Sequence, residues 1–188
     1  MRDLENLATT MDRKDQIFLS HAGEDSTFSR QLALEIGETL AKSGSKVNVF
    51  NTSDPEHRFR DFLDIVSAGE RWDSSEWEEE LRGYLRSNIQ DSAAYLLLVT
   101  PISLQKNSQW IQFEIDTAAD IFRTQGIHFI PCACGDHCLR LLPEKARIFQ
   151  GIDISNQNGI SMLCGVLNKI LTHDKNLPNN CIGPREET

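Results

Sequence analysis

The sequence predicts an α/β protein: a parallel sheet of about five strands, with helices on both faces, in three layers. Two observations predict this class. Short apolar runs alternate with segments whose apolar residues recur every three or four positions, the order of strand and helix in a parallel sheet. In addition, Tyr95 to Thr100 and Ile127 to Ile130 lack polar alternation, as do strands that are buried on both faces.

The expected strands are short, and in chain order they are Ile17 to Leu19, Val47 to Phe50, Tyr95 to Thr100, Ile127 to Ile130 and a weaker fifth, Ile152 to Ile154. Cys132 is expected to continue the fourth strand. Ligands of a parallel sheet bind outside the carboxyl ends of its strands. The loops of interest therefore run from Ser20 to Ser26, Asn51 to Ser74, Pro101 to Gln109 and onward from Pro131.

Four apolar stripes predict the helices, and their residues are Phe28, Leu32, Ile36 and Leu40; Trp77, Leu81, Leu85 and Ile89; Ile111, Ile115, Ala118 and Phe122; and Met162, Leu163, Val166, Leu167 and Ile170. Gly44 stands where the first helix would have its C-terminal cap. Ser75 and Glu78 have the spacing of a capping box at the start of the second.

Composition places the chain among ordinary globular proteins. It has 188 residues, 39% of them hydrophobic and 25% charged, which suits one domain with one sizeable core. We expect an N-terminal extension over 1–15, the folded domain over 16–175 and a loose tail over 176–188. No apolar run is long enough to span a bilayer, and the N-terminus lacks a signal pattern. These features predict a cytosolic protein that does not bind membranes.

The charge balance argues against nucleic acid as a partner. The net charge of −9 repels phosphate backbones. Five cysteines at irregular spacings indicate reduced thiols. A zinc site at Cys132, Cys134, His137 and Cys138 is disfavoured, because four ligands within seven residues are too close together for the usual site, and we expect no metal.

Glu114 is the strongest candidate for chemistry. On a helical wheel it falls inside the apolar arc of its helix rather than opposite it. A carboxylate that faces a core is costly unless it is paired or neutral, and burial raises its pKa. The functional interpretation competes evenly with a structural one, in which Glu114 pairs with an arginine or lysine or is stabilised by the N-terminus of its helix. The loop from Ser20 to Ser26 could hold a phosphate but lacks GxGxxG and Walker motifs.

Four segments follow one another in a recognisable order: IFLSHAGED at 17–25, VNVF at 47–50 with the long stretch to Trp72, LLVTPISL at 97–104 and SQWIQFE at 108–114. They resemble, respectively, the first strand and loop, the second strand and BB loop, the third strand and its turn, and the WxxxE-like segment of Toll/interleukin-1 receptor (TIR) domains. The resemblance covers about Gln16 to Ile154. It implies the flavodoxin-like three-layer TIR fold, and the long BB loop is more similar to prokaryotic members.

The resemblance implies an enzyme that cleaves NAD between nicotinamide and ribose. Only Glu114 matches the glutamate that catalytic members of the family require. The residues expected to bind substrate are Ser20, His21, Ala22, Phe50, Ser53, Trp72 and Trp110. NAD would be the substrate, and no cofactor is expected. The family also implies self-association through TIR–TIR contacts, and a role in bacterial antiphage defence, by depleting NAD or by making a nucleotide signal for a separate effector.

Two other functions remain open. The first is a non-catalytic TIR adaptor, or a module that interferes with host TIR signalling; a costly carboxylate in an apolar arc counts against it. The second is a nucleoside deoxyribosyltransferase, which has similar topology and also uses a glutamate. A receiver domain is disfavoured, because Thr100 and Pro101 stand where its phospho-accepting aspartate would be needed.

Overall fold

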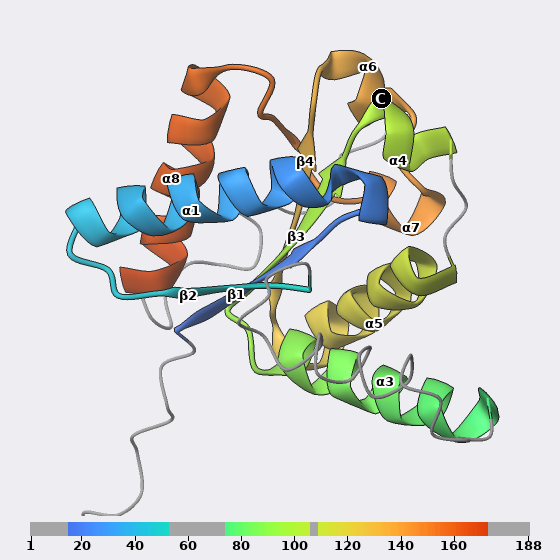
Figure 1. Ribbon diagram of the computed structural model, residues 1–188. Coiled ribbons are helices and arrows are strands. Elements are labelled where there is room, and N and C mark those ends of the chain that lie inside the picture. The colour runs from blue at the N-terminus through green and yellow to red at the C-terminus, as the bar shows by residue number, and fades with distance from the viewer. Residues whose placement is uncertain (1–14, 53–73, 106–108, 173–188) are drawn as a thin grey trace, which may run out of the picture.

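The computed structural model describes residues 15–52, 74–105 and 109–172, without the side chains of 74–77, 105 and 136. Its five strands are β1 (Gln16–Ser20), β2 (Asn48–Asn51), β3 (Ala94–Val99), β4 (His128–Ala133) and β5 (Ile152–Asp153). All pairs are parallel and the order is β2-β1-β3-β4-β5 (Figure 1). This is the flavodoxin-like order, so the predicted fold class is confirmed.

Helices cover both faces of this sheet. They are η1 (Gly23–Asp25), α1 (Ser26–Lys42), α3 (Ser74–Gln90), α4 (Pro101–Gln105), α5 (Gln109–Gln125), α6 (Asp136–Arg140), α7 (Glu144–Arg147) and α8 (Gln157–Thr172). Helices α1 and α8 lie on one face, and α3 and α5 lie on the other (Figure 1). None of the helices in the described ranges is long and apolar enough to cross a membrane.

The sheet separates two apolar cores. Every residue of β3 is buried, as the missing polar alternation predicted. Its side chains alternate between the faces: Leu96 joins the core under α1 and α8, and Tyr95 joins the core under α3 and α5. The ring of Tyr95 stacks on Phe18, with centroids 5.7 Å apart, and meets Phe129 edge-on at 4.8 Å.

The ends of α1 and α3 test the two predictions of helix caps. Gly44, at φ +83°, follows α1, and its N–H donates to the Ala41 carbonyl over 3.0 Å, so the predicted C-terminal stop is confirmed. Helix α3 instead begins at Ser74. Ser75 therefore lies inside the first turn, and its predicted place as the N-cap is wrong.

Two members of the predicted stripes are on the wrong face. Phe28 is 38% exposed and Met162 is 53% exposed. Helix α8 buries Leu163, Cys164, Leu167 and Leu171 instead. Met162 directly precedes this set, and one residue rotates the side chain by about 100° around the helix, which takes Met162 out of the core.

Candidate functional site

The predicted catalytic and loop residues meet at the carboxyl end of β1. Ser20 is the last residue of β1, and Glu114 lies in the second turn of α5, which follows β3. Strands β1 and β3 are neighbours, and the chain leaves them toward opposite edges of the sheet. In parallel α/β proteins, ligands bind outside the strands at such a reversal of strand order.

Ser20 and Glu114 are joined by a hydrogen bond. The Ser20 hydroxyl donates to Oε2 of Glu114, across 94 residues of sequence. Ser20 is 1% exposed and Glu114 6%, so this bond is shielded from solvent. Among the described residues, ion pairs are formed by Asp116 and Asp120 of α5 but not by Glu114. Within the described part of the chain, the hydrogen-bond partner of Glu114 is thus a neutral hydroxyl, and the arginine or lysine of one structural interpretation is not found.

Burial changes the protonation of Glu114. Loss of solvent raises the pKa of this carboxyl from 4.5 to about 7, and the hydrogen bond from Ser20 opposes the rise. The predicted position inside the apolar arc is confirmed, because Glu114, Ile115 and Ala118 are all buried. Near neutral pH, the carboxyl therefore exists in both its ionised and its protonated form.

Tyr95 lies beside this pair and was missed by the sequence analysis. It is wholly buried, and its hydroxyl has no hydrogen-bond partner among the described residues. Burial and the charge of Glu114 raise the pKa of Tyr95 well above its ordinary value, and Ser20 opposes them. A signal was present, because Tyr95 is the one side chain with a polar atom in the run from Ala93 to Val99.

A second group of polar side chains joins the loop after β1 to the end of β3. The Thr100 hydroxyl donates to Oδ2 of the buried Asp25 over 2.8 Å. The same hydroxyl oxygen accepts the backbone N–H of Ser103 at 3.0 Å. These bonds fix the loop that begins with Ser20. Asp25 was not among the predicted site residues, since the loop sequence does not indicate which acid turns inward.

His21 and Ala22 follow Ser20 and are buried with it, at 9% and 4% exposure. Burial lowers the pKa of His21 below 6.5, against a backbone hydrogen bond at Leu19 and the charge of Asp25. The imidazole is therefore mostly neutral at pH 7. Both residues directly follow Ser20 in the chain and are buried with it. Their contact with a substrate stays a prediction.

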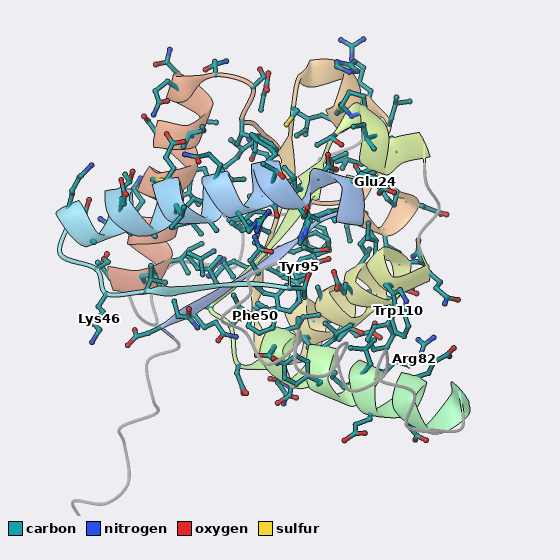
Figure 2. The ribbon with its side chains drawn as sticks, viewed as in Figure 1. Glu24, Lys46, Phe50, Arg82, Tyr95 and Trp110 are labelled. Atoms are coloured by element: carbon teal, nitrogen blue, oxygen red, sulfur yellow. The ribbon has the colours of Figure 1, made fainter. Side chains whose placement is uncertain are left out.

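Trp110 and Phe50 lie on different parts of the core around α3. Trp110, one turn before Glu114, is half-buried, with the Arg82 guanidinium 5.3 Å from the centroid of its ring (Figure 2). Phe50 is 3% exposed, and its ring stacks on Phe18 at 5.1 Å. Phe50 is thus part of the aromatic core beneath the carboxyl ends of the strands. The other two predicted substrate contacts, Ser53 and Trp72, lie outside the described residues.

The cysteines of the rejected zinc motif are spread over β4, the turn after it and α6. Cys132 lies in β4, as predicted. Cys138 Sγ is 3.3 Å from Nε2 of His137. Within the described ranges, no three His, Cys, Asp or Glu side chains gather in a way that could hold a metal ion.

The sequence matches none of the family models and none of the curated proteins with which it was compared. A fold by itself does not determine function. The function must therefore be inferred from the residues of the site.

Proposed function

We propose that the protein is a TIR-type enzyme that cleaves NAD between nicotinamide and ribose, with Glu114 as its catalytic carboxylate. The observation that carries the proposal is the placement of Glu114. It is buried at the reversal of strand order and bonded to the Ser20 hydroxyl, and no cation of the described residues pairs with it. A structural carboxylate of that depth would ordinarily be paired with a positive charge.

The chemistry needs only one carboxylate. Nicotinamide leaves from a cationic form as a neutral molecule, so no acid has to protonate it. The ribose acquires positive charge as the bond breaks, and an adjacent carboxylate stabilises that charge, as in glycosidases. Ser20 would hold the carboxylate in one orientation, and the buried surroundings would strengthen its electrostatic effect.

In this mechanism the ionised form of Glu114 is the active one. With a pKa of about 7, cleavage should increase as the pH rises through neutrality. Capture of the ribosyl group by water would give nicotinamide and ADP-ribose with release of a proton, and capture by an atom of the same molecule would give nicotinamide and a cyclic isomer of ADP-ribose. In a bacterium under phage attack, such a reaction would deplete NAD or supply a signal to a separate effector, with copies of the chain associating through their TIR surfaces.

The test is mass spectrometry of NAD incubated with the purified protein at low and high protein concentration. Glu114→Gln is the test variant, and Glu38→Gln, at an exposed position of α1, is the matched control. We expect nicotinamide release by the wild type and the control but not by Glu114→Gln. A co-product one water lighter than ADP-ribose would indicate cyclisation. Equal release by all three would refute the role of Glu114, and no release at any concentration would favour the adaptor.

A further inference from the structure

The buried hydroxyl of Tyr95 has no evident structural purpose. Its ring packs between Phe18 and Phe129, and phenylalanine would fill the same space without burying a polar atom. Nothing in the described part of the chain forms a hydrogen bond with the hydroxyl, and a buried polar group without a partner costs free energy. Such a group in a well-packed core calls for an explanation from its surroundings.

Those surroundings are the Ser20–Glu114 pair. Tyr95 is aligned with Phe18 in the sheet, and Ser20, two residues after Phe18, faces the same side. That side carries α5, so the phenol lies between the middle of the sheet and the helix of Glu114 (Figure 2). The charge of Glu114 raises the pKa of the phenol, and the hydroxyl of Ser20 lowers it.

We propose that Tyr95 is a positioning residue for Glu114, with its phenol donating a hydrogen bond to Ser20 Oγ while Ser20 donates to the carboxylate. A serine oxygen can accept one bond while its own proton is donated elsewhere. The bond forms when Ser20 turns a free lone pair toward the phenol. Each bond in such a chain strengthens the next, so the Ser20 O–H stays directed at the carboxylate oxygen, and this hydrogen bond keeps Glu114 ionised and oriented.

Other charged or titratable side chains are also present on the loop and elements around α5. Among them are His21 after β1, Arg82 on α3, His128 on β4 and Lys145 on α7. Arg82 stacks on Trp110 and Phe113, and Lys145 pairs with Asp116 at 2.9 Å. The causes of the Glu114 pKa shift are burial and the Ser20 bond, and none of these four groups. A response of Tyr95 near pH 7 that vanishes in Glu114→Gln would therefore report on Glu114.

The first experiment needs no enzyme activity. The chain has two tyrosines, Tyr84 and Tyr95, so labelling the tyrosine Cζ with ¹³C gives two signals, which Tyr84→Phe assigns. We expect the Tyr95 signal to move with a midpoint near pH 7, to lose this movement in Glu114→Gln, and to lose most of its amplitude in Ser20→Ala. An unchanged amplitude in Ser20→Ala would mean that the charge of Glu114 acts on Tyr95 directly and not through Ser20. It would overturn the proposed chain of hydrogen bonds. A signal that does not respond to pH would also overturn it.

The second experiment deepens the proposed function and rests on it. Tyr95→Phe should move the pH of half-maximal NAD cleavage upward by about half a unit, because one neutral hydrogen bond no longer supports the ionised carboxylate. Tyr84→Phe, which removes the other phenol hydroxyl, is the control and should leave the profile unchanged. Identical profiles for both variants would overturn the proposal. If the wild type does not cleave NAD, the proposed function fails, and the NMR titration still decides the role of Tyr95.

Discussion

Replacing Glu114 with glutamine should stabilise the protein, and more so at higher pH. In the folded state the pKa of Glu114 is about 7, against 4.5 for the free side chain. The folded protein therefore holds the proton more tightly than the unfolded chain, and stability falls as the pH rises from about 4.5 to about 7. At 1.36 kcal/mol per pH unit, the loss is roughly 3 kcal/mol. Glutamine keeps the shape without the charge and avoids this loss.

The assay is urea unfolding of the wild type, Glu114→Gln and the exposed control Glu38→Gln between pH 4 and pH 8. The free energies of unfolding of the wild type and Glu114→Gln should agree closely at pH 4. By pH 8 the variant should be more stable by about 3 kcal/mol. Glu38→Gln should follow the wild type throughout. A difference that does not change with pH would refute the buried, elevated-pKa carboxyl, as would a variant that loses stability at pH 8.

Two further predictions concern Ser20 and the glycines of α8. Ser20→Ala removes the donor that favours the ionised Glu114, so the pH of half-maximal NAD cleavage should rise by about one unit; a profile like that of the wild type would contradict the role of this bond. Gly159→Ala should lower the free energy of unfolding by more than about 2 kcal/mol, because its Cβ would lie 1.8 Å from the Asp153 carbonyl oxygen. Gly165→Ala, with open space at the same helix, should raise it by about 0.5–1 kcal/mol, and equal effects in urea unfolding would contradict this packing.

The fold could be predicted because burial on both faces of a sheet leaves a strong apolar signal. Strand β4 is an example: the apolar run predicted a strand to Ile130 that Cys132 continues, although Pro131 between them cannot donate a backbone hydrogen bond. The strand continues to Ala133. The N–H groups of His128 and Cys134 point to β3, so position 131 points to the other side, where pairing with β5 begins only at Cys132. Proline is tolerated at position 131 because no backbone carbonyl of a paired strand lies opposite the N–H that another residue would carry there.

The site was only partly predictable, because its geometry depends on contacts between distant segments. The helical wheel identified Glu114, since one helix determines which way that side chain faces. Nothing local could pair it with Ser20, 94 residues away, or place the phenol of Tyr95 next to both. The inward turn of Asp25 depends likewise on Thr100 at the end of another strand. Only the register of β1 against β3 brings these groups together.

The shortness of β5 restricts how copies of this chain can associate. It is an edge strand of two residues, Ile152 and Asp153. The Asp153 carboxylate accepts the backbone N–H groups of Gly135 and Ser155, at 3.0 and 2.9 Å. Short edge strands and charged side chains both discourage the addition of a foreign strand. Assembly on this side would therefore use helix or loop surfaces and would not extend the sheet, which also protects the folded protein from edge-to-edge aggregation.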